Sequence, residues 1–131
     1  MTIYMKLGGR PAMTRALDDL FGRLNADPSL APAATSMDSE IRADLLEFLI
    51  FLAGGSPVYD GLPVSKMLSP LCPTNEAFDD FVDHVATSMI GTERPVRIEA
   101  DLRLMLEHIR PHVVDRNPDR FMSSADGNAV A

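Results

Sequence analysis

Apolar residues recur every three or four positions in four long stretches of the chain, which is the spacing of helices with one buried face. The first stretch follows Gly9 and ends near Ala26, because Pro28 cannot continue a helix. The second begins between Thr35 and Asp38, a loose capping pattern, and ends at a glycine pair. The third covers residues 74–90, and the fourth opens at Pro95. The apolar positions are Met13, Leu17, Leu20, Phe21 and Leu24, then Ile41, Leu45, Phe48, Leu49 and Leu52, then Phe78, Phe81, Val82, Val85 and Met89, then Ile98, Leu102, Met105, Leu106, Ile109 and Val113.

Shorter segments separate these four stretches. Residues 2–7 are expected to form a leading turn, residues 30–36 a connection of small residues and proline, and residues 62–71 a short segment before the third helix. No stretch alternates with a period of two, so no strand is predicted. The pattern predicts an all-α domain over residues 1–115, followed by a disordered tail over residues 116–131.

Composition limits the possible functions and surroundings. The 131 residues suffice for one core, and the net charge of -7 disfavours binding to nucleic acid or to an anionic membrane. The single cysteine, Cys72, excludes an internal disulfide and favours the cytoplasm. The most apolar run, residues 45–53, is too short to span a bilayer, and residues 1–6 lack the apolar core of a signal peptide.

The order of the glycine and aromatic signals resembles the truncated globin family, closest to its first group. Tyr4 and Leu7 stand before the first glycine pair, and Tyr59 follows the second. The other matching residues are Gly8, Gly9, Pro11, Asp27, Pro28, Leu30, Gly54, Gly55, Pro57, Gly61, and the entry into the third helix at residues 74–78. The resemblance implies a two-over-two helical sandwich, with Gly8, Gly9, Gly54, Gly55 and Gly61 at its chain reversals.

Four positions depart from what the resemblance implies for a haem pocket. The histidine that ligates iron in haem-binding members falls at Leu68, and no histidine occurs between Met1 and Asp83. The distal tyrosine falls at Phe21. The polar distal residues fall near Ile41 and Leu45, and the phenylalanine that wedges the haem is replaced by Ala33 or Ala34.

These losses favour a haem-free, degenerate truncated globin, with no cofactor expected and a former pocket filled by side chains or by an apolar ligand. Such a protein would act as a binding, sensing or protein-interaction module. Its unknown protein partner or small apolar ligand is expected to contact an apolar patch of Val64, Met67, Leu68 and Leu71. The alternative is a haem-binding truncated haemoglobin that binds or senses oxygen or nitric oxide. Met67, beside the lost position, is then the candidate iron ligand.

Other reactive groups give no catalytic or metal-binding pattern. His108 and His112 are four residues apart but lack a third ligand, and positive charge is favourable near the end of a helix. His84 is expected at the boundary of the core, and Cys72 is expected to be a buried small side chain rather than a covalent tetrapyrrole anchor. No catalytic residue is predicted, and the oligomeric state does not follow from the sequence.

Overall fold

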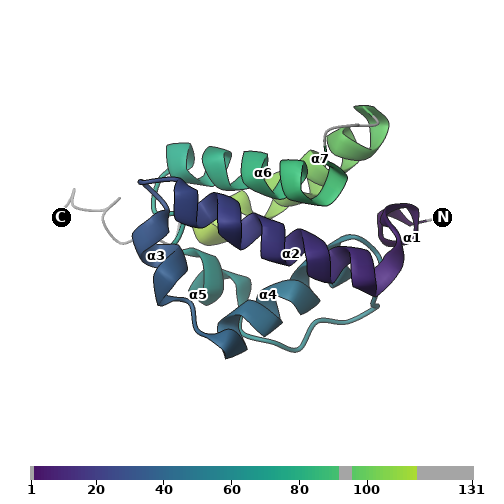
Figure 1. Cartoon of the computed structure of the whole chain (residues 1–131), viewed down its shortest axis with the longest axis horizontal. Helices are drawn as coiled ribbons and strands as arrows, with labels where there is room; N and C mark the ends of the chain where they lie inside the picture. The colour runs from purple at the N-terminus through teal and green to yellow at the C-terminus, as the bar shows by residue number, and fades with distance from the viewer. Residues whose placement is uncertain (1, 92–95, 115–131) are drawn as a thin grey trace.

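The computed structural model describes residues 2–91 and 96–114, and these residues form seven helices and no strand. Figure 1 shows the long helices α2, α4, α6 and α7 packed across one another, with the short helices at their ends. The helices are α1 (Ile3–Leu7), α2 (Gly9–Ala26), α3 (Ala31–Ser36), α4 (Ser39–Leu52), α5 (Val64–Leu68), α6 (Asn75–Ile90) and α7 (Val96–Val113).

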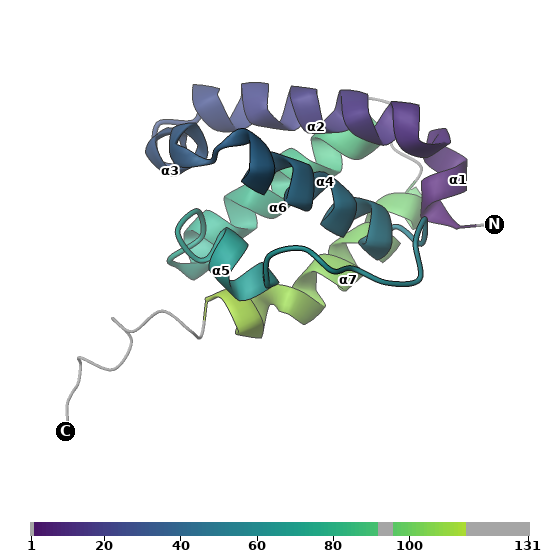
Figure 2. The same cartoon turned by 90° about the horizontal axis from the view of Figure 1, so that it is seen from below.

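The architecture is the two-over-two sandwich that the sequence predicts. Helices α2 and α4 form one layer, helices α6 and α7 form the other, and α5 lies against α7 near α4 (Figure 2). The apolar stripes of the four long helices meet between the layers, where Leu24, Leu45, Phe78 and Leu102 are fully buried. The spacing of these residues in the sequence therefore does specify the buried faces.

The first two helices are joined by a turn that requires glycine. Thr2 caps α1 by accepting a hydrogen bond from the Met5 backbone N–H at 3.2 Å, and α1 ends at Gly8, whose φ is 113°. This is a backbone conformation that glycine adopts without steric cost. The Tyr4 N–H donates to the carbonyl of Ala53 at 2.9 Å, so α1 is tied to the far end of α4.

The region around the start of α4 differs from the sequence prediction. Residues 31–36 form the helix α3 instead of a connection, with a proline in its first turn, where a missing N–H is tolerated. Helix α4 begins at Ser39, and its cap is Asp38, which accepts from the Ile41 N–H at 2.9 Å. Thr35 belongs to the preceding helix, so the predicted capping pattern from Thr35 to Asp38 is wrong.

The last two helices agree with the predicted pattern over the described residues. Thr74 caps α6 by accepting from the Ala77 N–H at 3.1 Å, and Arg110 lies in the last turn of α7. The predicted helix opening at Pro95 and the predicted tail over residues 116–131 lie outside the described residues. None of the described helices combines the length and the apolar character needed to cross a membrane. A cytoplasmic location remains a prediction from the sequence.

Candidate functional site: a thioether-lined cavity between α5 and the α3–α4 corner

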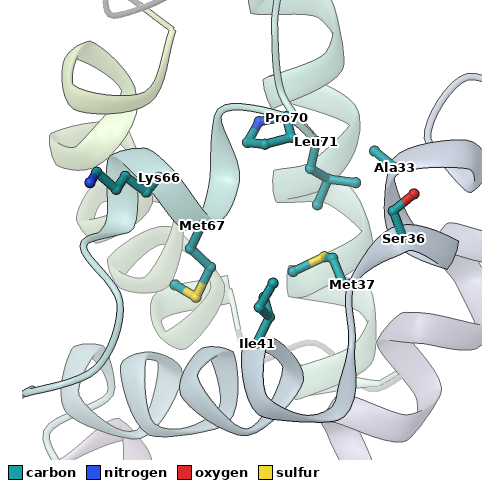
Figure 3. Close-up of a pocket in the computed structure, with 8 residues that line it drawn as sticks. All are labelled: Ala33, Ser36, Met37, Ile41, Lys66, Met67, Pro70 and Leu71. Atoms are coloured by element: carbon teal, nitrogen blue, oxygen red, sulfur yellow. The ribbon is translucent and has the colours of Figure 1, made fainter.

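An apolar cavity of about 130 Å³ opens where α5 faces the corner between α3 and α4. Figure 3 shows its lining side chains, which come from these three helices and the turns that follow α3 and α5. Most are apolar; Ser36 contributes a hydroxyl and the exposed Lys66 an ammonium group. The lining residues are Ala33, Ser36, Met37, Ile41, Lys66, Met67, Pro70 and Leu71.

Two methionines enter this cavity from separate elements. Met67 extends from α5 and Met37 from the turn before α4. The Ile41 side chain stands between them, and the end of Met67 is turned away from Met37 (Figure 3). Met67 is only 2% exposed, whereas Met37 is half-buried. Each thioether carries a sulfur lone pair, which gives the cavity two soft donor atoms.

Tyr59 fixes the surroundings of the Met67 sulfur. Its hydroxyl donates to the Leu62 carbonyl at 2.5 Å and lies 3.9 Å from the Met67 Sδ. Burial, with a smaller contribution from the Asp44 carboxylate, raises the pKa of Tyr59 to about 12. The phenol therefore keeps its proton at neutral pH and stays a hydrogen-bond donor next to the thioether.

The structure divides the positions that the sequence singled out into two groups. Ala33, Ile41 and Met67 line the cavity. Four others are core residues with exposures of 3% or less: Phe21, Ala34, Leu45 and Leu68. Leu68, at the position where the resemblance implies histidine, is completely buried and does not line the cavity, whereas its neighbour Met67 does.

The predicted exposed apolar patch around α5 is wrong. Met67, Leu68 and Leu71 are at most 2% exposed, and Val64 is half-buried. These side chains pack inward, against the core and around the cavity, and so they do not present a surface to a partner protein. A protein partner elsewhere remains a prediction.

Arg42 is a residue near the cavity that the sequence analysis missed. It follows the cavity residue Ile41 on α4, and its Cζ lies 4.1 Å from the centre of the Phe21 ring. Among the described residues it has no carboxylate within ion-pair distance, so the aromatic face is its contact. The sequence signal for this contact is weak: Arg42 is a basic residue in the first half of α4, where acidic residues are favoured.

Comparison with known proteins gives the chain its family. A family model described as bacterial-like globin matches residues 2–114, which is most of the chain. The chain belongs to this family. This globin is 33% identical to the group 1 truncated haemoglobin GlbN of Nostoc sp. over 90 residues, which are 67% of this chain and 75% of that protein. It is 28% identical to GlbN of Synechocystis sp. over 102 residues, 77% of this chain and 82% of the relative.

Solved structures share the fold. A mutant of the truncated haemoglobin from Tetrahymena pyriformis, in its Fe(III) form, superposes with a TM-score of 0.77 at 24% identity. The match covers 87% of this globin and 98% of that chain. A second neighbour, THB1 of Chlamydomonas reinhardtii, gives a TM-score of 0.71 at 23% identity, with coverage of 86% and 95%. The truncated-globin fold predicted from the glycine motifs is confirmed.

The expectation that this globin has no cofactor is wrong. Its relatives are named haemoglobins, and the Tetrahymena structure is that of an iron form, so haem is the cofactor to which the family points. The expectation rested on the substitutions at four haem-pocket positions, whereas the family match covers the whole domain. The comparisons favour the haem-binding alternative over the haem-free reading.

The remaining reactive groups of this globin lie away from the cavity. His84 pairs with Asp27 at 2.9 Å between α6 and α2 and is 25% exposed, which matches its expected place at the boundary. Cys72 is completely buried, as predicted, and burial raises the pKa of its thiol to about 12, so it is not a reactive thiolate. Within residues 2–91 and 96–114, no three His, Cys, Asp or Glu side chains gather to hold a metal ion.

Proposed function

We propose that this globin binds haem between α5 and the α3–α4 corner, with the Met67 thioether as a protein ligand of the iron. The observation that carries the proposal is that Met67 lines the cavity from α5 while the neighbouring Leu68 does not. Membership of the globin family supports haem as the cofactor. Binding or sensing of a diatomic gas is the role that the relatives' names suggest for such a haem.

The chemistry of the lining suits this cofactor. Methionine is an established haem ligand, and the apolar walls of Ile41, Leu71 and Pro70 match the apolar faces of a porphyrin. Lys66 carries a cation at the rim, where the porphyrin's carboxylates would meet solvent. The three histidines of the chain are His84, His108 and His112, and none of them lines the cavity.

The size of the cavity sets a condition on binding. Its volume of about 130 Å³ is below the roughly 300–1,000 Å³ of ordinary ligand pockets, so α5 has to move away from α4 to admit a porphyrin. Helix α5 has only five residues and is followed by Pro70. Ser69 Oγ donates to the Val113 carbonyl at 3.0 Å, and the Leu62 N–H donates to Asp44 Oδ2 at 3.0 Å. These two bonds at the ends of α5 are the ones a movement would strain or break.

The residues in and around the cavity would then have separate roles in binding haem. Met67 supplies a sulfur lone pair, Tyr59 restrains that sulfur by its hydroxyl, and Ile41 and Leu71 exclude water. Haem, when bound, supplies an iron centre for gas binding or one-electron transfer. Arg42 on the Phe21 ring places a cation on the α4 side of the site.

A titration of the purified protein with hemin tests the proposal. The wild type should give a protein-specific Soret band that saturates at one equivalent. Met67→Leu, which keeps the apolar volume, should weaken haem binding by about tenfold or more, since a lost ligand costs at least the roughly 1.4 kcal/mol of one decade. Met13→Leu is the matched control, because Met13 is also 2% exposed but lies on α2 away from the cavity.

Two results would count against haem binding through Met67. The absence of a saturating band in the wild type would contradict haem binding altogether. Equal haem affinity in the wild type and in Met67→Leu would leave haem binding intact but would show that Met67 is not a ligand.

A third variant, Ile41→Trp, tests where haem binds. The larger side chain fills the cavity, so it should abolish haem uptake while the helical circular dichroism stays unchanged.

A further inference from the structure

The cavity between α5 and the α3–α4 corner has the size and the lining of a site for one small apolar molecule. Its volume is about 130 Å³, and apolar cavities of roughly 150 Å³ inside proteins take up benzene or xenon. We propose that this cavity binds an uncharged compound with a single aromatic ring. The inference goes beyond the proposed haem binding, because it concerns the protein without haem and requires no movement of α5.

The interior of the cavity is apolar, and its rim reaches solvent. Met37, Ile41 and Leu71 point from three segments into the same space (Figure 3), and Leu71 is only 2% exposed. Ser36 and Pro70 also line the cavity, and both are exposed. A small molecule can therefore enter from solvent at this rim while the core stays packed.

The polar groups of the lining do not suit a charged ligand. The Ser36 hydroxyl donates to the Pro32 carbonyl at 3.1 Å, so its proton is already used. The exposed Lys66 side chain runs away from Ile41 and Leu71 (Figure 3). A charged group inside the cavity would lose its hydration without gaining a partner, which lowers affinity, whereas an uncharged ring carries no such cost.

The two methionines of the lining favour an aromatic ring over an aliphatic one. Met37 and Met67 line the cavity from two separate segments. Methionine sulfur makes favourable contacts with the edge of an aromatic ring, and its three rotatable bonds let the side chain adapt to a ligand. The Tyr59 hydroxyl lies 3.9 Å from the Met67 sulfur and restrains it. The half-buried Met37 is therefore the side chain that adjusts to the ring.

Hydrogen bonds at both ends of α5 hold this wall of the cavity in position. The Leu62 N–H donates to Asp44 Oδ2, and Ser69 Oγ donates to the Val113 carbonyl, both at 3.0 Å. The cavity is thus preformed, and less binding free energy is lost to ordering the protein when a ligand enters.

Fluorine NMR of fluorobenzene with the haem-free wild type tests the proposal. We expect one saturable site, from which benzene displaces fluorobenzene. Cyclohexane should bind at least about threefold more weakly than benzene, because it lacks the sulfur–aromatic contact. Benzoate should bind at least about tenfold more weakly, because its carboxylate finds no partner. The ring should shift the ε-methyl signals of Met37 and Met67 but not that of Met13, which is 2% exposed and lies outside the cavity.

Two variants of the lining test its contribution. Ala33→Leu fills the cavity and should abolish binding. Ala77→Leu is the matched control, because both alanines are half-buried against the core but Ala77 lies on α6 and does not line the cavity. Met37→Leu should weaken fluorobenzene binding about threefold and leave cyclohexane binding unchanged.

Several outcomes would overturn the proposal. Absence of saturable binding would do so, and so would binding that leaves both methionine signals unshifted; these wild-type measurements decide the matter even where Ala33→Leu fails to fold. Cyclohexane or benzoate binding as tight as that of benzene would contradict the aromatic or the uncharged character of the ligand. Failure of haem binding is seen separately, as the absence of a Soret band with hemin, and leaves the fluorobenzene result unaffected.

Discussion

His84 Nε2 lies 2.9 Å from Asp27 Oδ2, which joins the middle of α6 to the C-terminal end of α2. Asp27 also accepts from the backbone N–H and the hydroxyl of Ser29, at 3.1 and 2.8 Å. One carboxylate therefore satisfies three donors at the turn that leads into α3. The turn holds α3 in place, and α3 forms one wall of the cavity.

The Asp27 carboxylate makes stability depend on pH. The His84 hydrogen bond first, and the Ser29 hydroxyl next, lower the pKa of Asp27 below its ordinary value. A carboxyl with a lowered pKa in the folded state contributes stability above its unfolded pKa and loses it as pH falls through the folded value. Asp27→Asn should reduce the free energy of unfolding by about 1 kcal/mol at neutral pH and flatten its dependence on pH below about 4. Urea unfolding measures both effects. Asp18→Asn, an exposed carboxylate on the same helix, should change neither.

Arg110 connects α7 to α6 through several acceptors at once. It binds Glu107 at 2.7 and 2.9 Å, Asn75 Oδ1 at 3.1 Å and Asp79, and its guanidinium lies 4.5 Å from the centre of the Phe78 ring. The Glu107 hydrogen bonds are the largest cause of its raised pKa. Arg110→Lys should cost about 1–2 kcal/mol of unfolding free energy, because a lysine ammonium group cannot bind several acceptors in the planar geometry of a guanidinium. The cost is no larger because the carboxylates are partly exposed to solvent. Thermal unfolding checks this, with the exposed Arg15→Lys as control; equal melting temperatures would contradict it.

Gly55 is required by a close approach of two helices. A Cβ built there would lie 2.5 Å from the Tyr4 ring and 2.8 Å from Ile50 Cγ2. Gly55→Ala should therefore destabilise the protein by about 1–3 kcal/mol, since the Tyr4 ring and the Ile50 side chain have to shift. Gly22→Ala is the matched control, because a Cβ built at Gly22, inside α2, meets nothing within 4 Å. Alanine there should stabilise the folded protein by up to about 1 kcal/mol. Two changes of the same sign would contradict the steric argument.

Tyr59→Phe tests the group that restrains Met67. The variant keeps the ring, whose centre lies 5.4 Å from that of Phe48, and removes the hydroxyl that reaches Leu62 and the sulfur. We expect a stability loss of about 1 kcal/mol and a weaker haem complex whose spectrum shifts, because the thioether is less restrained. Tyr4→Phe is the control, since among the described residues the Tyr4 hydroxyl donates no hydrogen bond. A lower stability with an unchanged haem spectrum would mean that the Tyr59 hydroxyl stabilises only the loop around Leu62 and does not influence the Met67 sulfur.

The sequence predicted the four long helices, and the glycines that precede the first and end the second, because each of these signals is local. It missed α3, since residues 31–36 are small and include a proline, which reads equally well as a loop. The site was harder to predict. A shift of one residue on the five-residue α5 turns a side chain by about 100°, and that turn separates Met67 from Leu68. The contact between Arg42 and Phe21 depends on the tertiary packing of two helices, which no local pattern encodes.

Leu68→His tests whether α5 can rotate to present a different ligand. Position 68 is completely buried and does not line the cavity, so without haem an imidazole there should be held neutral in the core. Its folded pKa is then lowered, and folding stability should fall as pH drops through the unfolded histidine pKa of about 6.5. Hemin should reverse this loss if α5 turns to present the imidazole. In that case Leu68→His/Met67→Leu should bind haem as tightly as Leu68→His. Continued dependence on Met67 in the histidine variant would mean that α5 keeps its present orientation and that position 68 is purely part of the core.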